Sequence, residues 1–215
     1  MNSFIIQKYI ERPLLINKRK FDIRVWVLVN HTGKWYFFKE GYLRTSGSDF
    51  KLDDSNPDDQ YVHLTNNAVQ RHAENYGEFE EGNQLSFKQF QNYLDKHYSD
   101  KNINFYEDWL PKMKQMVKHS LMAARRKLNP NNIKLCFELF GYDFIMDEDF
   151  NWWLIEVNTN PCLEESSLLL KYYLRRMVDD MLKIVIDREF PKPKKLSKKS
   201  NKSKHKSRLN NHKHK

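Results

Sequence analysis

The amino-acid sequence predicts an α+β fold, in which an antiparallel sheet is flanked by helices. Segments with the two-residue periodicity of strands alternate along the chain with segments that have the 3.6-residue periodicity of helices. Neighbouring strand-like segments are also joined by short polar turns, which favours antiparallel pairing. Long helices combined with antiparallel strands are typical of α+β proteins.

Five segments are expected to form strands. Residues 31–34 supply a turn between the second and the third, and residues 147–151 join the last two in a hairpin. Residues 64–70 are short and ambiguous. The five expected strands are residues 4–9, 21–29, 35–38, 136–146 and 152–157.

Three segments are expected to be helical. Ser86 and Gln89 have the spacing of a capping box, and apolar residues follow them at helical spacing. The same spacing extends over residues 108–128 and 166–187.

The positive charge of the chain is concentrated at its C-terminus. The formal net charge is +9, but residues 192–215 carry ten Lys, one Arg and no acidic residue. Residues 1–191 therefore have 26 basic and 28 acidic side chains, a net charge of −2. Residues 192–215 contain too little apolar surface to offset the entropy of ordering, so we expect a disordered tail. Solubilisation and docking on an acidic partner are both open roles for it, and nucleic-acid binding has little support.

Composition argues against several other classes. No apolar stretch approaches ~18 residues, so no transmembrane span is expected. The first residues lack the basic region of a signal peptide. Cys136 and Cys162 are too few for a disulfide framework or a zinc site, and they fit a reducing cytosol. Residues 1–191 are expected to form one domain, truncated at its N-terminus because the chain begins almost inside an expected strand.

Asp143, Glu156 and Asn158 are candidate metal ligands. Asp143 interrupts an apolar strand, and Glu156 and Asn158 share one face of the next strand. The hairpin brings the two carboxylates near each other, where they repel unless a cation lies between them. Oxygen ligands of this kind suit Mg²⁺ that also binds substrate phosphates. A hydrated, half-exposed hairpin face is the alternative interpretation.

A second polar strand face carries Lys20, Asp22 and Arg24, and Arg44 is expected on an adjacent strand. Two arginines beside a carboxylate–metal centre suit phosphoryl or acyl-phosphate transfer. A solvated strand face with ordinary salt bridges is the alternative. None of the six glycines belongs to a glycine-rich phosphate-binding motif.

Several motifs, in this order, resemble the tubulin tyrosine ligase and ligase-like family. The resemblance covers about residues 4–191, and residues 75–83 are most similar to the tyrosine ligase itself. The other matching segments are residues 6–13 (IQKYIERP), 19–29 (RKFDIRVWVLV), 40–45 (EGYLRT), 63–66 (HLTN), 140–144 (FGYDF) and 153–158 (WLIEVN).

The resemblance implies the C-terminal subdomain of an ATP-grasp fold and an amide-forming ligase activity. In that reaction ATP phosphorylates an acceptor carboxylate, and the amine of a free amino acid then displaces the phosphate. The simplest expectation is addition of tyrosine to the acidic C-terminal tail of tubulin. The implied location is the cytoplasm and its cytoskeleton, with the cilium as one candidate.

The resemblance also implies roles for individual residues. They are Gln7, Lys8 and Ile10 for the adenine pocket, Lys20 and Asp22 for the nucleotide, Thr65 for the nucleotide or the amino acid, Arg24 and Arg44 for the carboxylate and the phosphoryl charge, and Asp143, Glu156 and Asn158 for Mg²⁺.

Two departures from the family leave alternatives open. The stretch after Asn158 (TNPCLE) differs from that of the tyrosine ligase, so glycine and glutamate remain candidate donors. The N-terminal domain and central subdomain of the family have no counterpart here. A truncated, non-catalytic microtubule-binding module is therefore the alternative from another functional class.

Overall fold

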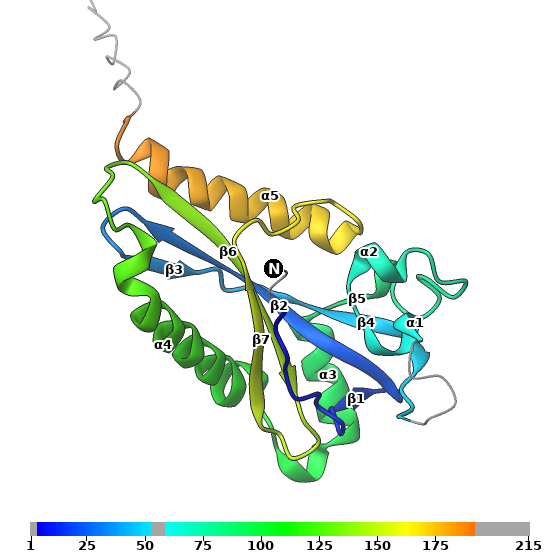
Figure 1. Cartoon of the computed structure of the whole chain (residues 1–215). Coiled ribbons are helices and arrows are strands. Elements are labelled where there is room, and N and C mark those ends of the chain that lie inside the picture. Colours follow the sequence, from blue (N-terminus) through cyan, green and yellow to red (C-terminus); the bar gives the residue numbers. More distant parts are fainter. Residues whose placement is uncertain (1–3, 53–58, 192–215) are drawn as a thin grey trace, which may run out of the picture.

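A computed structural model describes residues 4–52 and 59–191 and shows an antiparallel sheet flanked by helices (Figure 1). The order of the main strands is β5-β4-β2-β6-β7, and β1 and β3 both pair with β2. The strands are β1 (Leu15–Ile16), β2 (Arg19–Asn30), β3 (Trp35–Phe37), β4 (Tyr42–Asp49), β5 (Gln84–Ser86), β6 (Phe137–Met146) and β7 (Trp152–Asn158).

Five α-helices accompany the sheet in the part of the chain that the structure describes. They are α1 (Gln60–His63), α2 (Asn67–Gln70), α3 (Phe87–His97), α4 (Leu110–Leu128) and α5 (Leu168–Leu182). A π-helical turn, Phe105–Trp109, leads into α4, and another, Lys183–Asp187, continues α5. None of the described helices is both long and apolar enough to span a membrane.

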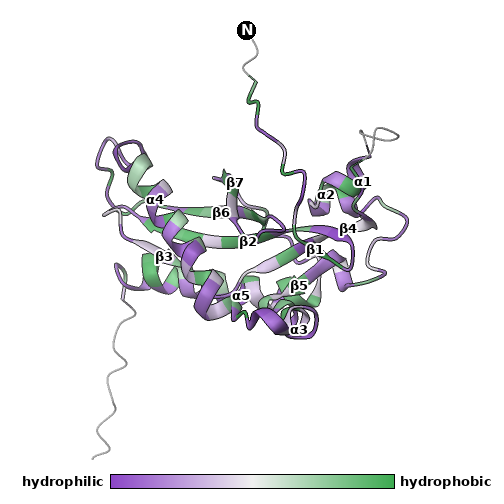
Figure 2. Ribbon diagram, turned by 90° about the horizontal axis from the view of Figure 1, so that it is seen from below, coloured by the Kyte–Doolittle hydropathy of each residue, from purple (hydrophilic) through white to green (hydrophobic). Residues whose placement is uncertain are grey.

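The sheet is covered on both faces. The larger core lies between the sheet and helices α3 and α4, where Phe21, Val25 and Val27 of β2 belong to the same cluster as Phe90 and Met113. On the other face α5 packs over one end of the sheet. Its residues Leu170, Leu174 and Met177 cluster with Trp26 and Tyr42. Figure 2 shows apolar residues along the strands, while the helices carry both apolar and hydrophilic residues.

Most of the predicted elements are confirmed. The two hairpins form, and both side-chain–backbone bonds of the capping box between Ser86 and Gln89 begin α3. Residues 64–66 connect α1 to the short helix α2, which begins at Asn67 and ends at Gln70. The predicted alternation of buried and exposed side chains in β2 holds only for its first residues. From Ile23 to Val29 the side chains on both faces of the strand are buried. The predicted tail, residues 192–215, lies outside the described residues.

The predicted strand at residues 4–9 is wrong. This segment forms no ladder with any strand in the described part of the chain, and Phe4, Ile5 and Ile6 are 84 to 96% exposed. Gln7 makes one long contact, from its Nε2 to the carbonyl of Ile155 at 3.5 Å. Apolar periodicity alone does not produce a strand, because the backbone groups also need a neighbouring strand as hydrogen-bond partner.

A buried ion pair holds residues 75–83 against the sheet. Arg19 at the start of β2 is 1% exposed and donates to both carboxylate oxygens of Glu80, at 2.9 and 2.5 Å. Its guanidinium also lies 4.2 Å from the centre of the Phe79 ring. Thr45 of β4 donates a further hydrogen bond to Glu80 at 3.0 Å.

Replacing Glu80 with Ala is expected to destabilise the chain by about 3 kcal/mol, because it leaves the Arg19 guanidinium buried without a counter-charge. The free energy of unfolding in urea measures this loss. Glu78→Ala, at an exposed position nearby, is the matched control and should change stability by less than about 0.5 kcal/mol. Equal effects of the two substitutions would contradict this account of Arg19.

Candidate functional site

A row of charged side chains crosses four adjacent strands of the sheet. The backbone register places Asp22 opposite Arg44, Arg24 opposite Asp143, and Asp143 opposite Glu156. Directly opposite side chains on one sheet face are close neighbours. Strands β4, β2, β6 and β7 therefore contribute both positive and negative groups to one polar face.

Asp143 is the centre of this row. Its carboxylate accepts hydrogen bonds from Nε and Nη2 of Arg24, the latter at 2.8 Å, and from Nη2 of Arg44 at 2.8 Å. Burial by itself raises the pKa of Asp143, but the hydrogen bonds from Arg24 and the positive charges of Arg44 and Arg24 outweigh it and lower the pKa. Asp143 is therefore ionised although it is only 2% exposed.

Asp22 extends the network towards β4 and the segment before α2. It accepts two hydrogen bonds from Arg44, both at 2.6 Å, and one from the hydroxyl of Thr65 at 2.6 Å. Arg44 thus bridges Asp22 and Asp143, and these charges keep its pKa well above the ordinary value in spite of burial. Both arginines are committed to carboxylates of the protein.

Glu156 and Asn158 close the row on β7. The Asn158 amide donates to Glu156 at 3.0 Å and lies 3.5 Å from Asp143. The ladder shifts register between Asp143 and Phe144, which makes Ile155 an extra residue in β7. Such bulges redirect side chains, and this one keeps Glu156 opposite Asp143.

The donor set at this point fits Mg²⁺. Two carboxylates and one amide converge, and rotation of the amide presents its oxygen instead of its nitrogen. Within residues 4–52 and 59–191, no group of three or more His, Cys, Asp or Glu side chains gathers around one point. Two carboxylates and an amide would leave coordination positions for phosphate oxygens and water, which Mg²⁺ usually keeps.

Gly141 allows the side chain of Arg24 to lie against the backbone of β6. A Cβ atom at this position would stand 3.3 Å from Cδ of Arg24 and 2.9 Å from Cβ of Pro161. The side chain of Arg24 and the loop after β7 therefore pack on the bare backbone of β6, which requires glycine.

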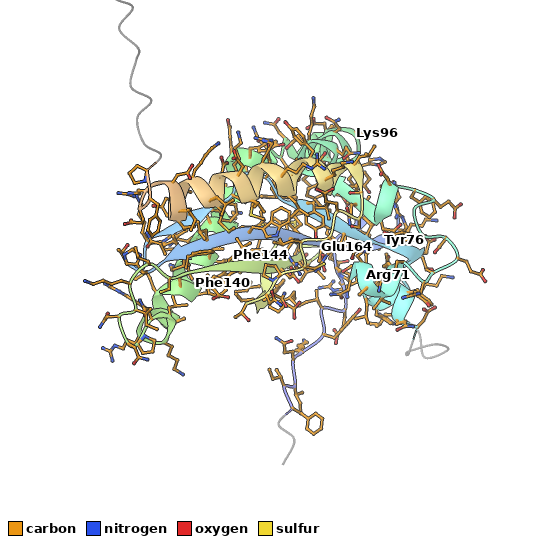
Figure 3. The ribbon with its side chains drawn as sticks, turned by 90° about the horizontal axis from the view of Figure 1, so that it is seen from above. Arg71, Tyr76, Lys96, Phe140, Phe144 and Glu164 are labelled. Carbon is orange, nitrogen blue, oxygen red and sulfur yellow. The ribbon has the colours of Figure 1, made fainter. Side chains whose placement is uncertain are left out.

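A pocket of about 340 Å³ opens beside the two arginines. Its wall includes Arg71 at the end of α2 and Glu164 in the loop after β7, both exposed and neither predicted from the sequence. Figure 3 shows Arg71, Tyr76 and Glu164 on the same side of the molecule. Burial raises the pKa of Tyr76, with Glu164 raising it further and Arg71 opposing. Residues in loops follow neither helical nor strand periodicity, so the sequence pattern did not indicate that Arg71 and Glu164 line a pocket.

The predicted adenine residues lie in a separate cleft. Gln7, Lys8 and Ile10 line a space of about 480 Å³ together with Trp153 and Ile155 of β7. Their role stays a prediction, because residues 4–10 make few contacts with the sheet.

Lys20 lies between this cleft and the charged row. Its ammonium donates to the hydroxyl of Tyr9 at 3.0 Å and to the carbonyl of His63 at 2.9 Å. Burial lowers the pKa of Lys20, and the nearby Asp22 opposes that effect. The structure thus gathers Asp22, Arg24, Arg44, Thr65 and the three predicted metal ligands, with Lys20 at their edge.

The network predicts acid sensitivity. Because the pKa of Asp143 is lower in the folded than in the unfolded chain, its contribution to stability is present above the ordinary value of 3.8 and is lost as the pH falls through the folded value. Unfolding in urea between pH 6 and pH 3 should therefore show a steeper loss of stability for the unmodified chain than for Asp143→Asn. Asp100→Asn, at an exposed position, should keep the steep dependence. Parallel curves for all three proteins would contradict the lowered pKa.

Known proteins resemble this chain over most of its length. The family model described as "Tubulin-tyrosine ligase family" matches residues 1–194. Tubulin glycylase 3B of Tetrahymena thermophila is 37% identical over 187 residues, which is 86% of this chain and 15% of the relative. Protein monoglycylase TTLL8 of Homo sapiens is 37% identical over 194 residues, 87% of this chain and 22% of the relative.

A third relative, tubulin monoglycylase TTLL3 of Mus musculus, is 36% identical over 197 residues, 86% of this chain and 20% of the relative. The chain thus spans about a fifth of the length of these curated relatives. The match covers the whole sheet, the charged row and both arginines. The chain belongs to the tubulin-tyrosine ligase family, whose fold is of the ATP-grasp type.

Proposed function

We propose that this chain is part of an ATP-dependent ligase that joins an amino acid, glycine, to a carboxylate of tubulin. The observation that carries the proposal is the charged row centred on Asp143. It places two arginines, two carboxylates and an amide on one polar face beside an open pocket. The named relatives support tubulin as the protein that is modified.

The proposed reaction has two steps. An oxygen of the acceptor carboxylate attacks the γ-phosphorus of ATP, ADP leaves, and an acyl phosphate forms. The amine nitrogen of the amino acid then attacks the acyl carbon, phosphate leaves with the bonding electron pair, and the nitrogen loses a proton. An amide remains, and one ATP has been converted to ADP and phosphate.

The arginines serve the first step. Arg24 and Arg44 are buried but line the pocket, and Asp143 and Asp22 hold their guanidinium groups in position. Fixed cations at this place orient the acceptor carboxylate and stabilise the negative charge of the transferred phosphoryl group. Lys20 and Thr65 would contact the nucleotide; Lys20 donates to Tyr9 in the wall of the cleft proposed for adenine, and Thr65 donates to Asp22 in the charged row.

Asp143, Glu156 and Asn158 would hold Mg²⁺. The ion would supply positive charge that offsets the negative charge of the phosphoryl group, which would favour attack by an anionic carboxylate. The contacts among the protein side chains would fix the position of these ligands. Asp143 is held by both arginines, and Glu156 is held by the amide of Asn158.

Glycine is the proposed donor in place of the tyrosine expected first. The three relatives described above are named glycylase or monoglycylase. The sequence after Asn158 also departs from that of the tyrosine ligase and lines the pocket through Asn160, Cys162 and Glu164. A tubulin substrate would place the protein on the cytoskeleton.

Replacing Glu156 with Gln is expected to remove Mg²⁺-dependent ATP binding, because it neutralises the exposed carboxylate of the metal site and leaves the buried network intact. Titration calorimetry with ATP, with and without Mg²⁺, measures the affinity on the chain and on a version extended upstream. Glu107→Gln, exposed and outside the site, is the control and should bind ATP as the unmodified protein does. Unchanged affinity in Glu156→Gln would remove Glu156 from the metal site.

Donor choice is expected to favour glycine. Incubation of the extended protein with ATP, Mg²⁺, tubulin and radiolabelled glycine, glutamate or tyrosine should label tubulin with glycine by more than about tenfold over the other two. Arg44→Gln should label none, because it removes a cation from the pocket. Preferential labelling by tyrosine or glutamate would overturn the donor assignment and keep the ligase class. No labelling by any donor, with ATP bound, would favour a non-catalytic binding protein.

A further inference from the structure

Tyr42 lies in the same cross-strand row as the charged groups of the site. The strand register places Tyr42 of β4 directly opposite Arg24 of β2, and Arg24 directly opposite Asp143 of β6. Arg44 follows two residues later on β4, so it points to the same face of the sheet as Tyr42. The phenol therefore has one guanidinium group beside it across the ladder and a second along its own strand.

Apolar neighbours hold the ring of Tyr42 in place. The centre of the ring lies 5.4 Å from that of Trp26, and the residue belongs to the same buried cluster as Leu170 of α5. Only 5% of Tyr42 is exposed, and it lines the pocket that Arg24 and Arg44 also line. The packing of the ring thus limits where its hydroxyl can lie.

The hydroxyl of Tyr42 makes no hydrogen bond within residues 4–52 and 59–191, where both neighbouring arginines donate to carboxylates. A second buried tyrosine, Tyr142 of β6, has its hydroxyl 2.9 Å from that of Ser120 on α4. Buried tyrosine hydroxyls usually have such a partner. The pocket is the open space in which a partner of the Tyr42 hydroxyl can lie.

The surroundings of this hydroxyl favour an oxygen with negative charge as its partner. Burial raises the pKa of Tyr42, although Arg44 and Arg24 oppose that effect. The hydroxyl therefore keeps its proton at neutral pH and is available as a hydrogen-bond donor. Arg24 and Arg44 use part of their donors on Asp143 and Asp22, so the hydroxyl adds a donor that no protein carboxylate of the described chain occupies.

We propose that Tyr42 is a catalytic residue of amide formation, whose hydroxyl donates a hydrogen bond to the acyl oxygen when the amine attacks. The proposal rests on the proposed function, because it concerns the acyl phosphate of that reaction. As the amine nitrogen bonds to the acyl carbon, one electron pair of the C=O bond moves to the oxygen. The pair returns when the bond to phosphate breaks, and phosphate leaves with the bonding pair. Tyr42 keeps its proton throughout, and the nitrogen releases a proton to solvent.

The two steps of the reaction differ in their need for this hydrogen bond. In the first step the acceptor carboxylate loses negative charge as it attacks phosphorus, so a donor to its oxygen does not lower the barrier. In the second step the acyl oxygen gains negative charge, and a fixed donor stabilises it more strongly than it stabilises the acyl phosphate. Tyr42 should therefore act on amide formation and leave phosphoryl transfer unchanged.

The test follows both steps in Tyr42→Phe, which removes the hydroxyl and keeps the ring. Rapid-quench experiments on the protein extended upstream, with ATP, Mg²⁺, tubulin and glycine, measure ADP formed in the first turnover and glycine joined to tubulin. Tyr42→Phe is expected to form ADP within about twofold of the normal rate but to join glycine on the order of 100-fold more slowly. Tyr142→Phe, at a buried position that faces α4, is the matched control and should keep both rates. Normal glycine joining in Tyr42→Phe would overturn the proposal.

Unfolding in urea separates a catalytic role from a structural one. Tyr142→Phe loses the contact with Ser120 and should unfold at a lower urea concentration than the unmodified chain. Tyr42→Phe loses no hydrogen bond within the described part of the chain and should unfold at the same concentration as the unmodified chain. A lowered midpoint for Tyr42→Phe would assign its hydroxyl to the fold and overturn the proposal.

A binding measurement separates this inference from the ligase assignment. Dimethylphosphinate has negative oxygens on a tetrahedral centre, as the reaction intermediate does, whereas acetate is planar. In titrations of the chain followed by NMR, Tyr42→Phe should weaken dimethylphosphinate binding on the order of tenfold and acetate binding less than about threefold. Equal losses for the two anions would overturn the role of the hydroxyl. Absence of ADP formation by the unmodified protein, with the selective loss observed, would contradict the ligase alone.

Discussion

The sharing of the Asp143 carboxylate between Arg24 and Arg44 is the interaction on which the polar face of the sheet depends. All three side chains are at most 6% exposed, so each charge is stable only while the others compensate it. Asp143 lies on β6, Arg24 on β2 and Arg44 on β4, which requires the three strands to keep one register. Electrostatics and strand pairing therefore specify the same alignment.

This constraint positions the groups that are free to bind a ligand. The backbone of Gly141 leaves room for Arg24, and the extra residue Ile155 in β7 keeps Glu156 opposite Asp143. Glu156 and Asn158 are thereby presented at the open end of a rigid network. If these groups bind a nucleotide and a metal ion as proposed, the site is organised before either arrives, which would lower the cost of binding and of reaction.

Charge is distributed unevenly over the molecule. The row centred on Asp143 contains both signs of charge, and its arginines and carboxylates hold one another in place. Helix α4 carries basic residues and no acidic ones, and in the described part of the chain none of these basic side chains belongs to an ion pair. The net charge of −2 for residues 1–191 hides this contrast, because opposite charges on separate surfaces cancel in the sum.

Local periodicity was sufficient to predict the class of fold, the hairpin around residues 147–151, the start of α3 at Ser86 and the shared face of Glu156 and Asn158. These features depend on neighbours along the chain. The sequence did not reveal that residues 4–9 lack a pairing strand. It also did not reveal that Arg24 and Arg44 donate hydrogen bonds to the same carboxylate, or that Arg71 and Glu164 line the same pocket. Those relations join segments far apart in sequence, and they arise only when the sheet order β4-β2-β6-β7 and the packing of the loops bring the segments together.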